Sequence, residues 1–169
     1  MASGTFGPTQ PDHCVIALKR LAVSTSTAPN RNPSLTSLTL GGASLTGASA
    51  RFTPGGPATS IAAARCTDAS CAEIEPNGDY EQLLVSWFAT DGSFDASRSL
   101  FGADANGDCT GPCLHDPPPP SVMTSWTPPA PGDGGASGAV SFWAVIRDDR
   151  GGVGWLAGAA TQQIAAAMQ

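Results

Sequence analysis

Apolar and polar residues alternate along several stretches of the chain, and a two-residue alternation predicts β-strands with one buried face. The clearest case is the segment 81–90, EQLLVSWFAT. One face of this strand would carry Leu83, Val85, Trp87 and Ala89, and the other Leu84, Ser86 and Phe88. An Asp-Gly pair at 91–92 is typical of the turn that ends such a strand. We therefore expect 81–90 to be a central strand of a sheet.

The segment 139–155, AVSFWAVIRDDRGGVGW, has the pattern of a β-hairpin. One face of its first strand would carry Val140, Phe142, Ala144 and Ile146, and the other Trp143 and Val145. Arg147 to Gly152 would form the turn, and Val153 and Trp155 lie on the returning strand. A hairpin of two alternating strands closed by a Gly-Gly turn is typical of a strand pair within a β-sandwich.

Shorter stretches of the same kind occupy much of the remaining chain. They are 14–24, 34–40, 58–66 with Ile61 pointing inward, and 121–127, with further short strands around Leu45 and Phe52. The 20 Gly and 15 Pro residues disfavour long helices and favour turns. About seven to nine short strands without a helical period predict an all-β fold, namely an antiparallel β-sandwich of two sheets.

Composition along the chain suggests one domain with appendages. Residues 1–29 form a lead with one predicted strand, 30–160 the sandwich domain, and 161–169 a C-terminal tail. Within the domain, about 96–120 has little apolar content and ends in four prolines at 117–120. Proline has no N–H to donate to a sheet, so we interpret this stretch as an inserted loop.

Charge excludes some classes of partner. The net charge is −6, and the eight basic residues form no cluster that could displace counterions from a nucleic acid. The sequence contains no apolar run of about 18 residues, so no membrane span is predicted. The opening MASGTFGPTQPDH lacks the pattern of a signal peptide, so an exported protein would already have lost its signal.

The five cysteines predict a disulfide-bonded, exported protein. Two pairs are close in sequence, in 66-CTDASC-71 and 109-CTGPC-113. We expect local bridges Cys66–Cys71 and Cys109–Cys113, although a long-range bridge such as Cys66–Cys109 stays open. Cys14 is left over, either as a free thiol or as half of a bridge to a segment outside this sequence.

One stretch has the spacing of a calcium loop. Asp104, Asn106 and Asp108 place oxygen ligands at positions 1, 3 and 5. However, Cys109 stands where such a loop has glycine, and His115 stands where it has a bidentate glutamate. Turns rich in Asx and Gly produce the same spacing without metal, so both interpretations are kept; no other cofactor is expected.

Catalytic motifs are missing from the sequence. There is no Gly-x-Ser-x-Gly elbow, no His-Glu-x-x-His helix and no phosphate-binding glycine loop. The two histidines, His13 and His115, fall in predicted loops. A zinc site at Cys109, Cys113 and His115 would lack the second ligand pair that structural zinc usually has. We expect a protein that is not an enzyme, and a small metal-dependent enzyme is the more distant alternative.

The aromatic residues allow two interpretations. They would fill the interior of the sandwich in the one that we favour. If Trp126 or Trp143 instead faced solvent in line with Tyr80 or Phe88, they would form a platform for carbohydrate.

Three segments together resemble a known family. The strand 85-VSWFATDGSFD-95, the block 126-WTPPAPG-132 and the hairpin 140-VSFWAVIRDDRGGVGW-155 resemble bacterial immunoglobulin-like, PKD-like modules of secreted proteins and surface lipoproteins, notably of myxobacteria-like organisms. The entry 29-PNRNPSL-35 is similar too, and the resemblance covers roughly residues 30–157. The long 96–120 insertion and the cysteine loops depart from this pattern.

The resemblance implies an immunoglobulin-like sandwich located outside the cytoplasm, whether extracellular, at the cell surface or periplasmic. It implies a non-catalytic role in adhesion, spacing or partner binding, with a protein or a surface glycan as partner. A lipid anchor on the full-length precursor would fit this setting. The alternative is a carbohydrate-binding accessory module of a secreted hydrolase. Fold does not choose between these roles.

Overall fold

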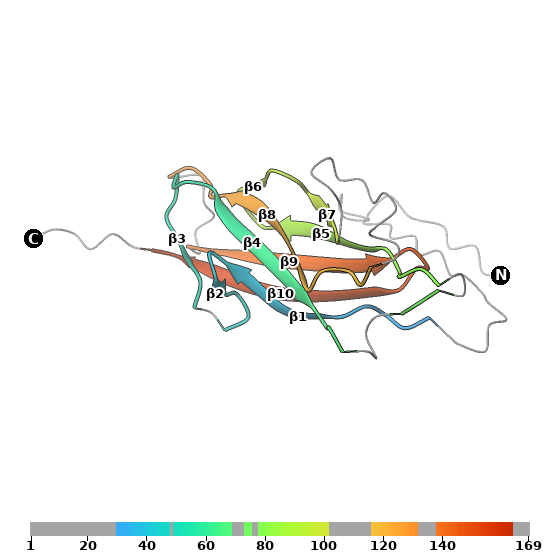
Figure 1. Cartoon of the computed structure of the whole chain (residues 1–169). Coiled ribbons are helices and arrows are strands. Elements are labelled where there is room, and N and C mark those ends of the chain that lie inside the picture. Colours follow the sequence, from blue (N-terminus) through green and yellow to red (C-terminus); the bar gives the residue numbers. More distant parts are fainter. Residues whose placement is uncertain are drawn as a thin grey trace, which may run out of the picture.

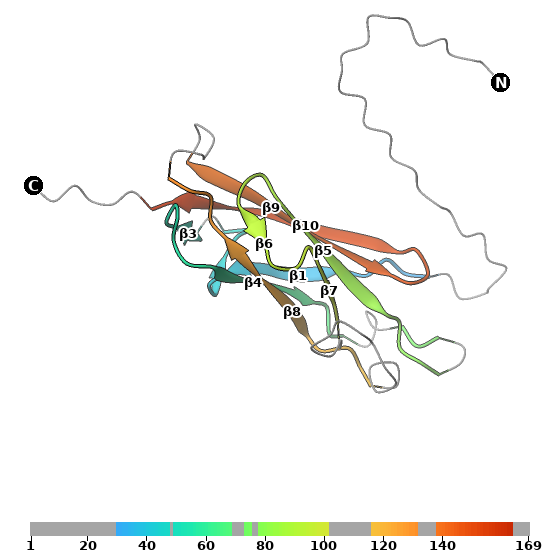
Figure 2. The same ribbon diagram turned by 90° about the horizontal axis from the view of Figure 1, so that it is seen from above.

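The computed structural model describes residues 30–47, 49–68, 73–75, 78–101, 116–131 and 138–163. Within these ranges the chain is all-β, has no helix, and forms two five-stranded sheets. The sheets lie one over the other as a β-sandwich, with the long hairpin of β9 and β10 in one layer and β4 and β8 in the other (Figures 1 and 2). The predicted all-β, two-sheet architecture is confirmed.

The first sheet has the strand order β2-β1-β4-β8-β6, and all of its neighbours are antiparallel. Its strands are β1 (Leu35–Leu40), β2 (Ala43–Ser44), β4 (Thr59–Arg65), β6 (Ser93–Phe94) and β8 (Ser121–Thr127). Ile61 on β4 is buried, as its position in the alternating pattern predicts.

The second sheet has the strand order β3-β10-β9-β5-β7. Its strands are β3 (Arg51–Phe52), β5 (Leu83–Ala89), β7 (Arg98–Leu100), β9 (Ala139–Asp148) and β10 (Val153–Gln162). The short β3 runs parallel to β10, and the other neighbours are antiparallel. The described residues form ten strands, one more than the upper end of the predicted seven to nine, and three of them have only two residues.

Contacts along both long edges close the sandwich. Between β6 and β7 the chain passes from the first sheet to the second, and the Thr124 hydroxyl is hydrogen-bonded to both the N–H and the carbonyl of Ala96 there. At the opposite edge the Ala159 N–H donates to the Leu45 carbonyl at 3.0 Å. Gly158 beside it leaves no room for a side chain, because a Cβ would lie 2.6 Å from the Leu45 backbone.

Aromatic rings fill the interior between the sheets. Trp126 of the first sheet is fully buried and meets Phe52 and Phe142 of the second edge-on, at ring-centroid distances of 5.5 and 4.9 Å. Its indole N–H donates to the Asp91 carbonyl at 3.1 Å, and that of Trp87 donates to the Ser99 hydroxyl at 2.9 Å. Each buried tryptophan therefore keeps the hydrogen bond that it would make in water.

A buried arginine holds the end of the predicted insertion, at the four prolines, against the first sheet. Arg65, the last residue of β4, donates from Nε to the Pro119 carbonyl at 3.0 Å, and from its two Nη atoms to the carbonyls of Cys66 and Pro118. The prolines cannot donate hydrogen bonds, but their carbonyls still accept them. Burial lowers the pKa of Arg65 from its usual value.

Some boundaries differ from those expected. The strand β9 extends to Asp148, so the turn is shorter than the predicted Arg147–Gly152, and Gly151 supports it with a φ of +94°. The strand β7 takes up the start of the predicted insertion at 96–120, and β10 runs to Gln162, two residues into the predicted tail. The predicted strand at 14–24 lies outside the described residues.

Candidate functional site

Three aromatic side chains are exposed on the outer face of the second sheet. Phe88 on β5, Trp143 on β9 and Trp155 on β10 are 50, 36 and 64% exposed. Phe88 lies directly opposite Trp143 in the β5–β9 register, and Trp155 lies two residues along from Ala157, the partner of Trp143 on β10. We call these three residues the aromatic face.

Strand geometry explains the arrangement of the aromatic face. Opposite residues on neighbouring strands have Cβ atoms about 5 Å apart, and diagonal neighbours are about 7–8 Å apart. The three residues therefore form a bent row across three consecutive strands, with Phe88 opposite Trp143 and Trp155 diagonal to it. In the part of the chain that the structure describes, none of these rings packs against another aromatic ring.

An open depression of about 390 Å³ lies next to Phe88 on the same face. Its lining residues come from β5, from β7 and the residue before it, and from β9: Leu84, Ser86, Trp87, Phe88, Ser97, Arg98 and Arg147. Ser86 is only 5% exposed and lies at the centre of this set. Arg98 is its direct partner on β7, and Arg147 donates from Nη1 to its hydroxyl at 3.0 Å.

The two arginines of the depression carry uncompensated charge. Neither Arg98 nor Arg147 has a carboxylate within ion-pair distance among the described residues. A guanidinium has five N–H donors, and Arg147 uses one of them on Ser86. The depression therefore combines an aromatic wall with many free donors and two positive charges.

A second polar cluster lies at the end of the sandwich, around the β9–β10 turn. Arg150 forms ion pairs with Glu73 and Glu81. Asp148 is buried and accepts hydrogen bonds from Asn30 at 3.0 Å and from the Gly152 N–H at 2.6 Å. The cluster joins the turn to the segments before β1 and before β5, so its role is structural.

Burial controls the charge of this cluster. Burial raises the pKa of Glu81 to about 7, Arg150 opposes the shift, and Asp148 and Glu73 add repulsion that favours it. Burial also raises the pKa of Glu75, with repulsion from Asp149 as the next cause. Burial lowers the pKa of Arg150, but hydrogen bonds and attraction to Glu81 and Glu73 outweigh it, so the net shift is upward.

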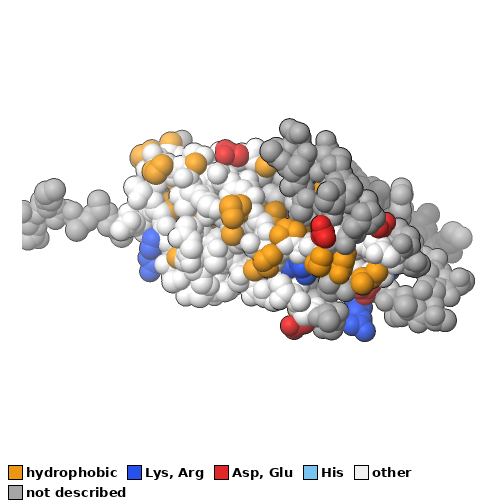
Figure 3. Space-filling view, in the orientation of Figure 1, with side chains coloured by type: hydrophobic (Ala, Val, Ile, Leu, Met, Phe, Trp, Pro, Cys, Tyr) orange, Lys and Arg blue, Asp and Glu red, His pale blue; other side chains and the backbone are white. Residues whose placement is uncertain are grey.

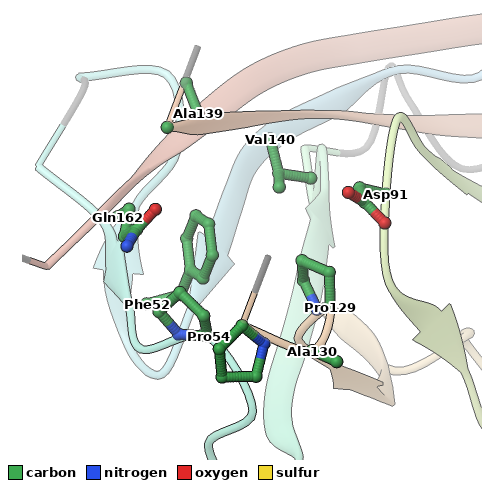
Figure 4. A pocket seen from close by; sticks show the side chains of 10 residues that line it. Phe52, Pro54, Asp91, Pro129, Ala130, Ala139, Val140 and Gln162 are labelled. Atoms are coloured by element: carbon green, nitrogen blue, oxygen red, sulfur yellow. The ribbon is translucent and has the colours of Figure 1, made fainter. Parts of the chain in front are cut away.

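A cavity of about 250 Å³ opens at the other end of the sandwich (Figure 4). Phe52, Pro54, Pro129 and Val140 give it largely apolar walls, and Asp91 and Gln162 lie on opposite sides of it. Residues 131 and 138, on either side of a stretch outside the described ranges, both line this cavity. We assign it no ligand.

The predicted metal and cysteine sites fall mostly outside the described residues. This holds for Asp104, Asn106 and Asp108, and for Cys14, Cys71, Cys109, Cys113, His13 and His115. Cys66 is described and is disulfide-bonded, but every cysteine that could be its partner lies outside the described ranges, so the pairing stays a prediction. No group of three metal-ligating side chains occurs among the residues that were placed.

The aromatic residues divide between the two interpretations given above. Trp126 is buried, as favoured, whereas Trp143 is exposed and aligned with Phe88, which is the arrangement of the carbohydrate platform. Sequence reasoning missed the pair of arginines beside it. The alternating pattern could have indicated Arg147, because this residue shares the outward register of Trp143. Arg98 lies in the stretch that was interpreted as an insertion, where no strand was expected.

Comparison with known proteins adds no relative. No protein-family model, no curated protein and no solved structure matches the chain. Among the described residues there is also no helix of the length and apolarity that a membrane crossing requires.

Proposed function

We propose that this chain is a non-catalytic, glycan-binding module with an immunoglobulin-like β-sandwich, which binds through the outer face of its second sheet. The observation that carries the proposal is the alignment of exposed Phe88 with exposed Trp143 beside a depression lined with hydrogen-bond donors. Sugar rings have an apolar C–H face and polar edges. An exposed aromatic surface next to free donors complements both parts.

The strand order supports the immunoglobulin-like part of the proposal. β1, β4 and β8 share one sheet, while β10, β9, β5 and β7 share the other, and a short strand, β3, runs parallel to the last strand. This arrangement is similar to the division of strands in immunoglobulin-like sandwiches, in which a buried tryptophan lies on the third main strand. Trp87 on β5 occupies the corresponding position.

The proposed setting is outside the cytoplasm, at the cell surface, in the periplasm or in the medium. Cysteine pairs in short loops are typical of oxidising compartments, and Cys66 is disulfide-bonded. Polymeric glycans are also ligands of that setting. We retain the local bridges Cys66–Cys71 and Cys109–Cys113 as part of the proposal.

Binding to soluble polysaccharides tests the proposal. We would measure electrophoretic mobility of the folded protein in native gels that contain a panel of neutral and acidic polysaccharides. Retardation by at least one polysaccharide is expected. Phe88→Ala and Trp143→Ala should each weaken binding by about tenfold or more, since a stacked ring contributes on the order of 1–2 kcal/mol.

Met123→Ala is the matched control. Met123 is 62% exposed on the outer face of the first sheet, so the variant removes a similar exposed apolar side chain from the opposite side. Its mobility should equal that of the wild type. Binding that persists in the double variant Phe88→Ala/Trp143→Ala would contradict the proposed face, and absence of retardation with every polysaccharide would favour a spacer or a protein-binding module instead.

A further inference from the structure

We infer that the depression over β5 recognises the anionic groups of an acidic polysaccharide, and that Arg98 and Arg147 bind those groups. This inference rests on the proposed function and names the class of glycan. It goes beyond the aromatic face because aromatic rings alone would accept neutral and acidic sugars alike. The arginines supply the positive charge that selects an acidic sugar.

The two arginines converge on the depression from neighbouring strands. β5 lies between β7 and β9, so Arg98 and Arg147 approach the depression from its two sides. Arg147 is the direct partner of Leu84, but its guanidinium reaches diagonally to the Ser86 hydroxyl. Arg98 is the direct partner of the same serine. Both positive groups therefore border one small region.

The charge around the two arginines supports the binding of an anion. The chain has a net charge of −6 and only eight basic residues. Within the described ranges, Arg65 is held by backbone carbonyls and Arg150 by two carboxylates, so both are committed to the fold. Among the described residues, Arg98 and Arg147 have no anionic partner, and both are exposed. Two like charges beside one depression repel each other, and a bound anion would relieve that repulsion.

The geometry of recognition also fits an acidic polysaccharide. A guanidinium binds a carboxylate or a sulfate through two parallel N–H···O bonds, and its flat surface also tolerates an aromatic neighbour. Phe88 forms one wall of the depression and also belongs to the aromatic face. A polysaccharide lying along the aromatic face would therefore bring its anionic substituents to the arginines. Carboxylates of uronic acids and sulfate esters share this chemistry.

Fluorescence titration of the whole chain with defined polymers tests the inference. The probes are polygalacturonate and alginate for carboxylates, dextran sulfate for sulfate esters, dextran and pullulan for neutral sugars, and poly-L-glutamate for carboxylates without sugar rings. We expect polygalacturonate, alginate or dextran sulfate to bind at least tenfold more tightly than the neutral polymers. Raising the salt from 50 to 200 mM should weaken that binding and leave binding of neutral polymers unchanged.

The variants Arg98→Gln and Arg147→Gln should each weaken binding of the acidic polymer about tenfold, and together by more, while leaving neutral polymers unaffected. Arg51→Gln is the matched control, because it makes the same change of charge on β3, outside the depression. Comparison of polygalacturonate and alginate with dextran sulfate shows whether the arginines bind carboxylates or sulfate esters.

Two results would overturn the inference. In one, neutral polymers bind as tightly as acidic ones and the double arginine variant changes nothing, which leaves the proposed glycan-binding face intact. In the other, poly-L-glutamate binds as tightly as the acidic polysaccharides and Phe88→Ala has no effect, which makes the depression a general anion site. Failure of every polysaccharide to bind, in contrast, contradicts the proposed function itself.

Discussion

The two outer faces of the sandwich obey the same strand geometry but carry different residues. On the first sheet the outward positions of β4 and β8 hold small or hydroxyl side chains: Ser60, Ala62, Ala64, Ser121 and Ser125, with Met123 among them. Figure 3, in which β4 and β8 face the viewer, shows a largely white surface with small hydrophobic patches. On the second sheet the outward positions include small residues such as Ser141 and Ala157, but they also hold Phe88, Trp143, Trp155 and Arg147.

This difference separates what the fold needs from what it does not. The first sheet pairs its strands fully with serine, threonine and alanine on its outer face, so strand formation does not require large outward side chains. An exposed tryptophan contributes less to folding than a buried one, because part of its ring stays in water. Stability therefore does not explain the aromatic residues of the second sheet, or its two arginines that form no ion pair among the described residues, whereas the proposed binding face does.

The largest expected effect contrasts a buried tryptophan with an exposed one. Trp126→Ala should lower the free energy of unfolding by about 3–5 kcal/mol, because it removes a fully buried ring that touches Phe52 and Phe142. Trp143→Ala should lower it by only about 1–2 kcal/mol, because this ring is partly exposed to solvent. Urea unfolding followed by circular dichroism measures both. Comparable losses for the two variants would mean that the outer ring is structural, and the comparison of faces would fail.

The arginine at the end of β4 and the arginine of the β9–β10 turn have different kinds of partner. Arg65→Met removes donors to neutral carbonyls and should lower the free energy of unfolding by about 2 kcal/mol at any pH between 5 and 8. Arg150→Met leaves Glu73 and Glu81 without their cation and should cost about 3 kcal/mol at pH 8.

The two losses should respond differently to pH. At pH 5 the Arg150→Met loss should be smaller, because Glu81 can take up a proton and the repulsion disappears. The check is guanidinium unfolding of both variants at pH 5 and pH 8. A pH-dependent loss in Arg65→Met, or a constant one in Arg150→Met, would contradict the assignment of partners.

The sequence predicted the alternation that underlies both faces but not the use of each face. Leu83, Val85 and Trp87 share one face of β5 and Phe88 lies on the other, as the alternation predicts, because strand geometry fixes the face of each position. Which aromatic residues end up exposed depends on what packs over each sheet, and a single strand pattern does not contain that information. Trp126 and Trp143 both lie in alternating segments, yet one is buried and the other exposed.

The site was predictable only in part for the same reason. The alternation separated Phe88 from the face of Trp87 and Trp143 from the face of Phe142, but the favoured interpretation buried all of these rings, and exposure of Trp143 in line with Phe88 was only the condition of the carbohydrate platform. The register that sets them opposite each other depends on pairing between segments more than 50 residues apart along the chain. Arg98 depends on β7, a strand of three residues in a stretch without apolar alternation, so the arginine pair required the folded structure.

The stability of the whole fold should also depend on pH through Glu81. The folded pKa of Glu81 is about 7, above its ordinary value, so the folded protein keeps a proton that the unfolded chain releases near pH 4.5. Stability from this group is therefore fully present below about pH 4.5 and is lost as the pH rises to about 7, by up to about 3 kcal/mol. Thermal unfolding across pH 4.5–8 measures it. Glu81→Gln should flatten this part of the profile, and an unchanged slope in the variant would assign the response to another group.

The smallest change is expected when an exposed aromatic ring is added to the first sheet, which lacks the proposed binding face. Met123→Trp places an exposed ring on the first sheet, at an outward position whose β4 partner is Ala62. Stability should change by less than about 0.5 kcal/mol, since the side chain stays in water. Polysaccharide binding should also be unchanged, because the β4 partner of this position is Ala62 and Met123 does not line the depression. If the variant gained binding equal to that of the aromatic face, a single exposed ring would suffice, and neither the cross-strand alignment of Phe88 with Trp143 nor the neighbouring arginines would be needed to explain recognition.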